Sequence, residues 1–190
     1  CAPVCSSNSG PCFDAHETPG CSNVACCQQI CLVDPTCCSF NWDIDCARTA
    51  ASSCGAPLPA NDTCATATPL AVGQTIEFST IRATTDALAL PASCDPGSGN
   101  TMGPDLWYSY ATERSGNIAV STCGSATDLR LAIYVGTCTG PVLVACGSNS
   151  VLCTPGTGAR VQFSAVCGTT YLIRVGGENP QQGGSGRFTL

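Results

Sequence analysis

The sequence contains no lysine and a single histidine, His16, in 190 residues. Its seven basic residues, all arginines, face thirteen acidic ones, which gives a net charge of −6. Because no basic cluster is present to neutralise phosphates, we expect no nucleic-acid binding. His16 lies in a turn sequence, where a hydrogen bond to a loop backbone is the expected role.

Catalytic signatures are also missing. The chain has no G-x-S-x-G, H-E-x-x-H, P-loop or dinucleotide-binding motif. A pair of carboxylates from distant strands could still act on a glycosidic bond, but nothing in the sequence selects two of the thirteen acids. The prediction is therefore that this chain is not an enzyme and uses no cofactor.

Long apolar runs are absent as well. No stretch reaches about eighteen apolar residues, the length at which a membrane-spanning helix becomes a candidate, so we expect no membrane span. A Cys-x-x-Cys pair is missing too, which excludes a thioredoxin-like redox motif. No export leader is visible in the first residues, and we expect that one was removed before residue 1.

Cysteine, in contrast, is abundant, with eighteen in the chain. This density is typical of disulfide scaffolds, which persist in oxidising compartments and not in a reducing cytosol. Zinc binding is the alternative, but zinc sites often add histidine ligands, and this chain has one histidine. We therefore predict a secreted, extracellular or cell-surface protein with disulfide-bonded cysteines. They are Cys1, Cys5, Cys12, Cys21, Cys26, Cys27, Cys31, Cys37, Cys38, Cys46, Cys54, Cys64, Cys94, Cys123, Cys138, Cys146, Cys153 and Cys167.

The cysteine spacing divides the chain into two pieces. Residues 1–54 hold eleven cysteines, residues 61–190 hold seven, and residues 55–60 form a short proline-rich linker. Both numbers are odd. Either two thiols stay free or at least one bridge leaves its own piece. Such a bridge would join the two domains, join two molecules, or connect to a cysteine beyond residue 190. The connectivity does not follow from the sequence.

Residues 1–54 are expected to form a disulfide-stapled two-helix module with an extended N-terminal arm. So short a segment cannot build a conventional core, and its bridges must stabilise it instead. Residues 23–34 have helical periodicity, with Asn23 or Ser22 as the cap and Pro35 as the stop. A second helix is predicted over residues 39–52.

This second helix would include Phe40 and Trp42. The two cysteine doublets, at 26–27 and 37–38, should each reach two separate partners. Neighbouring Cα atoms lie about 3.8 Å apart, which is below the usual disulfide range.

Residues 61–190 read as an all-β antiparallel sandwich, jelly-roll-like in style, because short alternating segments recur between Gly-, Pro-, Asn- and Thr-rich turns. In residues 129–135, for example, branched apolar residues alternate with Arg130, Ala132 and Tyr134, the pattern of a half-buried strand. The predicted strands are 75–80, 106–111, 117–122, 129–135, 141–145, 159–165, 170–175 and 187–190.

Two blocks of residues resemble known modules. The first resembles a cysteine-rich module of large secreted bacterial proteins, notably from planctomycetes; it comprises Cys12–Cys21, Ala25–Cys27, Val33–Cys38 and Trp42–Cys46. The second is similar to the β-sandwich related to pre-peptidase C-terminal domains; it comprises Asn61–Cys64, Pro104–Tyr108, Ser121–Gly124, Thr127–Asp128 and Gly168–Gly177. This resemblance implies a non-catalytic surface module.

The resemblance also raises the question of calcium. Relatives often carry acidic residues, candidate calcium ligands, in the hairpin between Cys146 and Cys153, whereas this chain has none there. Calcium needs several oxygen ligands with net charge, so a site at this hairpin is doubtful. Asp105 and Asp128 remain weak candidates elsewhere, with turn capping as the favoured alternative.

Two non-enzymatic functions remain open. The first is self-association as a fibre, sheath or surface-layer subunit, through residues 1–11 or the C-terminal strand. The second is binding of glycans or surfaces as an accessory module, with Trp107, Tyr108 and Tyr110 as candidate stacking residues. Because Tyr108 and Tyr110 share one strand face and Trp107 takes the other, at least one face must be core. We rank self-association slightly ahead.

Overall fold

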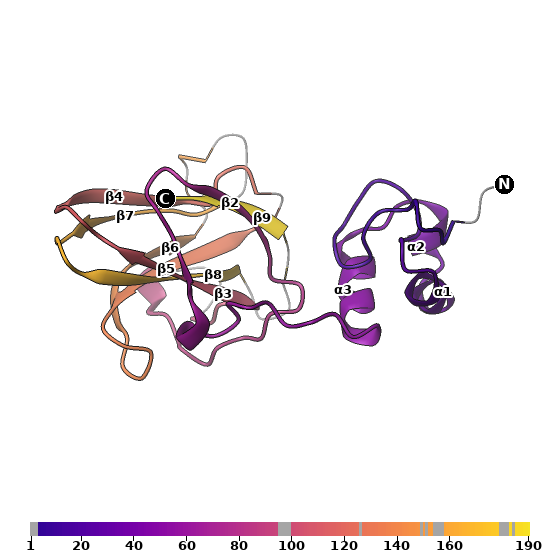
Figure 1. Ribbon diagram of the computed structural model, residues 1–190, viewed down its shortest axis with the longest axis horizontal. Helices are drawn as coiled ribbons and strands as arrows, with labels where there is room; N and C mark the ends of the chain where they lie inside the picture. Colours follow the sequence, from indigo (N-terminus) through magenta and orange to yellow (C-terminus); the bar gives the residue numbers. More distant parts are fainter. Residues whose placement is uncertain are drawn as a thin grey trace. The chain divides into compact units, whose positions relative to one another are not determined.

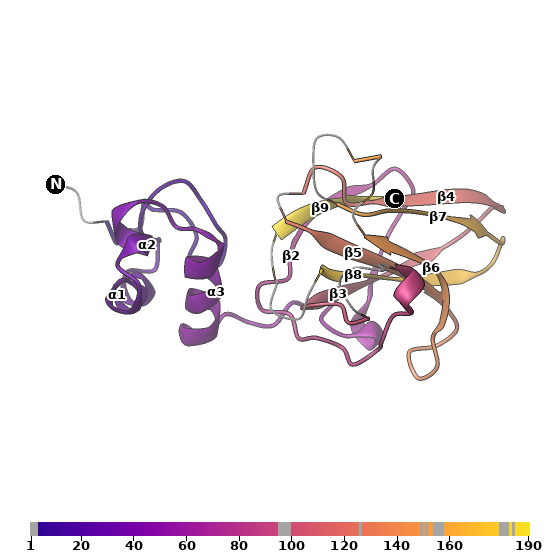
Figure 2. The same ribbon diagram turned by 180° about the vertical axis from the view of Figure 1, so that it is seen from behind.

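The computed structural model divides into two compact units, Cys1–Pro57 and Leu58–Leu190 (Figures 1 and 2). The residues that it describes are 4–94, 100–125, 127–148, 150, 152–153, 158–178, 183 and 185–190. Within these ranges, no helix is long and apolar enough to cross a membrane.

The first helix of the first unit confirms the sequence prediction. Helix α1 spans Val24–Val33, and the side-chain oxygen of Asn23 accepts a hydrogen bond from the backbone N–H of Cys26 at 3.1 Å. This cap satisfies one of the free donors at the start of the helix. Asp34 then takes up an extended conformation ahead of Pro35, so the helix ends where the sequence places its stop.

The second predicted helix is wrong at its start. Residues Thr36–Ser39 form a single turn, α2, and helix α3 begins only at Ile44 and ends at Ser53. The reason is Asp43, whose carboxylate accepts hydrogen bonds from the backbone N–H groups of Asp45 and Cys46, both at 3.0 Å. A capping residue has non-helical backbone angles, so the chain before it cannot continue the helix.

The two aromatic residues that the prediction placed in this helix therefore lie in a loop. Phe40 is exposed, whereas Trp42 is fully buried and donates its indole N–H to the carbonyl of Cys12 at 3.0 Å. Trp42 also pairs through its backbone with His16, whose Nδ1 lies 2.9 Å from the hydroxyl of Thr18. The sole histidine of the chain thus serves loop structure.

Five disulfides connect the segments of this unit. Both cysteine doublets reach separate partners, and each bridge stays within the unit. The pairs are Cys5–Cys27, Cys12–Cys21, Cys26–Cys54, Cys31–Cys38 and Cys37–Cys46. Besides cysteine and alanine, the buried apolar side chains among the described residues are Ile30 and Trp42. Cross-links therefore take the place of a large core.

The second unit is a β-sandwich of two sheets. One sheet has the strand order β1-β3-β8-β5-β6 and the other has the order β2-β9-β4-β7. The strands are β1 Thr68–Pro69, β2 Thr75–Ser79, β3 Asp105–Ala111, β4 Gly116–Ser121, β5 Leu129–Val135, β6 Val142–Ser148, β7 Arg160–Ala165, β8 Thr170–Gly177 and β9 Ser185–Thr189.

All eight predicted strands are present, with ends that differ by a few residues. The prediction missed β1, a two-residue strand that pairs with β3 and is parallel to it, while the other pairings are antiparallel. So short a strand has no alternation to read. The C-terminal strand β9 pairs with β2 along its whole length, from Thr75 opposite Thr189 to Ser79 opposite Ser185.

The main core lies between the two sheets. Inward residues of both sheets meet there, and two aromatic pairs join the layers: Tyr108 with Phe188, at 5.0 Å between ring centroids, and Phe163 with Tyr171, at 4.7 Å. Such tilted ring contacts add to the burial of apolar area. The core continues along β5 and β8 through buried Leu, Ile and Val side chains.

The outer face of the five-stranded sheet is also buried, which corrects the expectation of half-buried strands. Arg130 and Tyr134 on β5 are about as inaccessible as their inward neighbours. A second apolar cluster covers this face, and it includes side chains from the long connection between β2 and β3. Its buried members are Leu90, Cys94, Met102, Trp107, Ala132, Tyr134 and Leu172. The side chains of β5 do alternate between two faces, but the face that carries Arg130, Ala132 and Tyr134 is covered by a loop.

A glycine on β8 is required by this covering layer. A Cβ atom on Gly176 would lie 2.7 Å from both the Cβ of Asp105 and the Cγ of Met102. We expect Gly176→Ala to destabilise the sandwich by about 1–3 kcal/mol, the usual cost of overpacking. The matched control is Gly116→Ala on β4, where a Cβ would meet no atom within 4 Å. Urea midpoints measure both; equal midpoints for the two variants would contradict this packing.

Three disulfides stabilise the second unit, Cys64–Cys138, Cys94–Cys146 and Cys123–Cys153. Cys167 has an exposed thiol that forms no disulfide, and its sulfur donates to the carbonyl of Glu113 at 3.1 Å. Cys1 lies outside the described residues, as do positions 149 and 151 of the predicted hairpin. Among the described residues, each bridge lies within one unit, and Cys167 is the cysteine of the second unit that has none.

Candidate functional site

The three aromatic residues predicted to contact glycans do not form a platform. Trp107 is 1% exposed, Tyr108 3% and Tyr110 7%. The alternation of β3 sends Tyr108 and Tyr110 into the main core and Trp107 into the cluster on the outer face. An open stacking surface at these residues is therefore not what the structure shows. Trp107 nevertheless lines a recess that opens to solvent.

This recess, which we call the Trp107 recess, has a volume of about 430 Å³. It lies on the outer side of the five-stranded sheet, between the segment at residues 86–88, the turn after residue 62 and the β5–β6 connection. Its lining is Thr63, Cys64, Ala65, Asp86, Ala87, Leu88, Trp107, Cys138, Thr139 and Pro141. Among these ten residues there is one carboxylate and no basic side chain.

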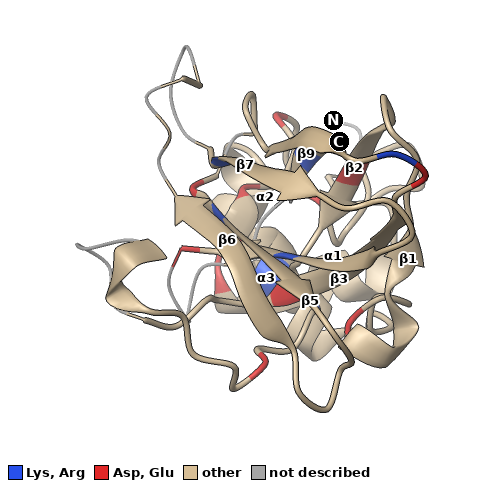
Figure 3. Cartoon of the chain, turned by 90° about the vertical axis from the view of Figure 1, so that its left-hand side faces the viewer, with Lys and Arg blue, Asp and Glu red and all other residues tan. Residues whose placement is uncertain are grey.

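A buried ion pair lies beneath the recess. The guanidinium of Arg174 donates from Nη2 to Oδ2 of Asp105 at 2.7 Å, and both side chains are fully buried. Burial raises the pKa of the Asp105 carboxyl, and the hydrogen bond and charge of Arg174 oppose this rise. Desolvation lowers the pKa of Arg174, but its interactions with Asp105 and Tyr134 together outweigh this effect, so the pKa is raised. Figure 3 shows the acidic and basic residues of the chain as short, scattered segments among uncharged ones.

Arg174 also fixes the segment that lines the recess. It donates from Nη1 to the carbonyl of Leu88 at 2.7 Å and from Nη2 to the carbonyl of Asp86 at 2.8 Å. The backbone N–H of Asp86 donates to Oδ2 of Asp105 at 3.1 Å. The guanidinium carbon lies 5.8 Å from the ring centroid of Trp107, within range of a cation–π contact. The wall of the recess is thus attached to strands β3 and β8.

The Asp86 side chain faces the recess and is held by the indole. Trp107 donates from Nε1 to Oδ2 of Asp86 at 2.6 Å. This hydrogen bond fixes the orientation of a carboxylate beside an apolar wall. Such a group can accept hydrogen bonds from ligand hydroxyls, and bonds to a charged acceptor are the stronger kind.

A second set of polar contacts joins Asn61 and Asp62 to Trp107 and Thr84, next to the recess. Asp62 accepts hydrogen bonds from the backbone N–H and the hydroxyl of Thr84, at 2.6 and 2.9 Å. Asn61 donates from Nδ2 to the main-chain carbonyl of Trp107 at 3.0 Å, and the main-chain carbonyl of Asn61 accepts a hydrogen bond from the backbone N–H of Trp107. None of Asn61, Asp62, Asp86 and Arg174 was predicted from the sequence as a site residue. Three of them, Asn61, Asp62 and Arg174, do lie in the blocks that resemble the pre-peptidase-like sandwich, and this was the signal available.

The rim of the recess adds hydroxyl groups on a cross-linked frame. Thr63 and Thr139 line it, and each is next in sequence to a cysteine of the Cys64–Cys138 disulfide. The Thr139 hydroxyl lies 3.0 Å from that of Thr137. A concave site with apolar walls and a few convergent polar groups is the usual form of a small-ligand site. The polar groups here suit an uncharged, hydroxyl-rich ligand.

The weak calcium candidates lie in different surroundings. The carboxylate of Asp105 faces the guanidinium of Arg174, so a cation already neutralises it. Asp128 lies just before β5, and its main-chain carbonyl accepts the N–H of Glu178 at 3.2 Å. In the described part of the chain, neither residue belongs to a group of three or more His, Cys, Asp or Glu side chains close enough to hold one ion. The prediction of no cofactor, with calcium as a weak alternative, stays untested.

A second recess, of about 460 Å³, lies at the β3–β4 turn. Tyr110 lines it together with apolar residues near β1, and Glu113, Arg114 and Ser115 supply its polar groups. In the part of the chain that the structure describes, none of these three side chains forms an ion pair, and only Ser115 has a side-chain hydrogen bond, accepting from the N–H of Cys167 at 2.9 Å. This site is less organised than the Trp107 recess.

Comparison with known proteins adds a family. Residues 60–190 match the model of a T9SS-associated family described as galactose binding domain-like. Among solved structures, the chain is similar to CsCBM6-3 from Clostridium stercorarium, determined in complex with cellobiose. The identity is 10%, the TM-score is 0.32, and the match covers 65% of this chain and 95% of that one. No curated protein matches the chain, and the resemblance of residues 1–54 stays a prediction.

Proposed function

The chain belongs to the galactose binding domain-like family, and on this premise we propose that its β-sandwich binds a carbohydrate at the Trp107 recess as a non-catalytic module. The observation that carries the proposal is the Asp86 carboxylate, oriented by the Trp107 indole N–H and backed by the buried Arg174–Asp105 pair. An acceptor fixed in advance loses little entropy when a sugar hydroxyl binds.

An extracellular or cell-surface location agrees with this function. Disulfides are stable in oxidising surroundings, and eight are present among the described residues. The family is T9SS-associated by its description. We therefore propose an accessory module of an exported protein, with glycans outside the cell as its partners. Of the two functions left open by the sequence, the family favours the one that was ranked second.

We predict that Asp86→Ala weakens glycan binding roughly 10- to 100-fold, because a hydrogen bond to a charged group contributes about 1.5–3 kcal/mol. The affinity of Asp86→Asn should lie between that of Asp86→Ala and that of the wild type, because the amide oxygen can still accept a hydrogen bond from the indole of Trp107. A glycan array first identifies the ligand, and calorimetry or an affinity gel then measures the dissociation constants.

The control is Glu113→Gln, which alters a carboxylate in the second recess and should leave affinity unchanged. If no glycan binds the wild-type protein, the proposed function is wrong. If glycans bind and Glu113→Gln weakens them while Asp86→Ala does not, the site is the second recess.

Self-association has one supporting observation, the exposed thiol of Cys167. The proposed N-terminal arm has less support, because Cys5 bonds to Cys27 within its own module. A thiol on the surface of a protein in an oxidising compartment can form a disulfide with a second molecule. We keep a covalent dimer through Cys167 as a second proposal.

For this dimer we expect a band at twice the monomer mass on a non-reducing gel after mild oxidation. Reductant should remove the band, and so should Cys167→Ser. A protein that stays monomeric, or a dimer that persists in Cys167→Ser, would contradict this second proposal and leave the carbohydrate site untouched.

A further inference from the structure

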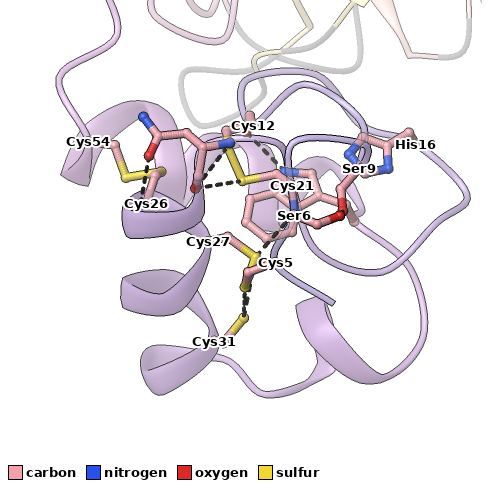
Figure 4. The surroundings of a disulfide bond; sticks show 12 residues. Cys5, Ser6, Ser9, Cys12, His16, Cys21, Cys26, Cys27, Cys31 and Cys54 are labelled. Atoms are coloured by element: carbon pink, nitrogen blue, oxygen red, sulfur yellow. Dashed lines mark hydrogen bonds between the residues drawn. A yellow bond between two sulfur atoms is a disulfide. The ribbon is translucent and has the colours of Figure 1, made fainter. Parts of the chain in front are cut away.

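Two disulfides of the first unit form one cluster of sulfur atoms. Cys5–Cys27 and Cys31–Cys38 lie so close together that all four Sγ atoms are within 4.8 Å of one another. Between the bridges, the Sγ of Cys31 is 3.6 Å from that of Cys5 and 3.8 Å from that of Cys27. Figure 4 shows Cys31 directed toward the Cys5–Cys27 bridge.

The distances between sulfur atoms of the two bridges are also those expected in a tetrahedral metal site. Four sulfurs at about 2.3 Å from a tetrahedral zinc ion lie about 3.8 Å from one another. The distances from the Sγ of Cys31 to those of Cys5 and Cys27, 3.6 and 3.8 Å, are already close to this value. Forming the site would require the two sulfurs of each bridge to move apart by about 1.7 Å, from the length of a disulfide bond to the spacing in a zinc site. Rotation of the side chains can supply this change.

The ligands come from three segments that the fold already brings together. Cys27 and Cys31 are four residues apart on α1 and so share one face of the helix. Cys38 lies on α2, and Cys5 lies in the segment before α1. The backbone N–H of Cys21 donates to the sulfur of Cys27 at 3.2 Å, a contact that stabilises negative charge on a thiolate.

We propose that Cys5, Cys27, Cys31 and Cys38 bind one zinc ion when the two bridges are reduced. A dithiol reductant supplies two electrons and two protons to each bridge and becomes a disulfide itself. The four thiols then release four protons as Zn²⁺ binds. Oxidation by a disulfide reverses the sequence and releases the metal. Disulfide and metal binding, which the sequence presents as alternatives, become two states of one cluster.

The proposal gives the module a way to stay folded before export. In a reducing compartment the bridges are lost. The large buried apolar residues in the described part of this unit are Ile30 and Trp42, so little else stabilises it. A zinc ion joining α1, α2 and the N-terminal segment would replace two of the five cross-links. The inference does not depend on the carbohydrate site.

The test uses the full chain, reduced with a phosphine without oxygen and titrated with Co²⁺ as a spectroscopic substitute for Zn²⁺. We expect one tetrahedral ion with four sulfur ligands per chain, displaced by Zn²⁺, and one added zinc in native mass spectrometry. Cys31→Ser/Cys38→Ser should lose this site. The matched control, Cys12→Ser/Cys21→Ser, removes two thiols from a neighbouring group that has only three sulfurs and should retain it.

Three results would overturn the proposal. The reduced wild-type protein could fail to bind cobalt in a four-sulfur site. Both double variants could bind equally, which would indicate chelation by an unfolded chain. Loss of binding in Cys12→Ser/Cys21→Ser alone would place the metal at other cysteines.

Discussion

Arg174→Met is expected to destabilise the β-sandwich by about 3–5 kcal/mol, because it leaves the buried carboxylate of Asp105 without its counter-charge. The loss should also free the segment at residues 86–88, since Arg174 donates to the carbonyls of Asp86 and Leu88. Glycan affinity and stability should therefore fall together in this variant. Urea unfolding followed by near-ultraviolet circular dichroism measures the free energy of unfolding.

The double variant Arg174→Met/Asp105→Leu separates charge from packing. Replacing a buried ion pair by apolar residues of similar volume is often close to neutral, so we expect most of the stability to return. A double variant as unstable as the sum of the two single variants would show that the two residues act independently and would contradict the account of the pair.

The loss of stability in Arg174→Met, relative to the wild type, should become smaller at acid pH. Burial raises the pKa of Asp105, and the variant loses the interactions with Arg174 that lower it. The folded variant therefore holds the Asp105 proton more tightly than the unfolded chain does. Its stability should rise as the pH falls and the carboxyl becomes neutral in the folded state.

The second large effect concerns the helical module. Cys26→Ser/Cys54→Ser removes the bridge between α1 and the end of α3, which closes 28 residues of sequence. The chain-entropy relation assigns such a loop about 3.6 kcal/mol. Because this unit has few large buried side chains, we expect the loss to unfold it. Protease sensitivity of residues 24–53 and loss of helical circular dichroism measure the change.

A matched control lies in the other unit. Cys123–Cys153 closes 30 residues of sequence, almost the same length, so the entropic cost of its removal is nearly equal. We expect the sandwich of Cys123→Ser/Cys153→Ser to remain folded, because its core between the sheets persists. If the two double variants respond alike, the module does not depend on cross-links more than the sandwich does.

Local patterns explain what the sequence could predict. The strand at residues 129–135 is recognisable because side chains alternate with a period of two, and α1 because Asn23 and Pro35 bracket it. Asp43 could have been recognised as a helix cap from the sequence, but the apolar residues Phe40 and Trp42 before it continue the helical periodicity. Capping decides such a boundary, because the backbone of the capping residue is not helical.

The candidate site could not be predicted, because it depends on contacts between distant residues. Arg174 reaches Asp86, 88 positions away in sequence, and the indole of Trp107 reaches the same residue over 21 positions. The sequence did single out Trp107 as a candidate stacking residue, on the strand face opposite to Tyr108 and Tyr110. Periodicity shows which residues share a face and not whether a loop covers that face, so the recess beside Trp107 could not be foreseen.

Recording the indole N–H signals of the two tryptophans during a glycan titration is the most direct test of the carbohydrate site. Trp107 lies in the recess and Trp42 in the other unit, so each chain contains its own control. We expect the Trp107 signal to shift with the ligand and to saturate at the affinity found by calorimetry, while the Trp42 signal stays in place. A glycan that binds without moving the Trp107 signal would contradict the account.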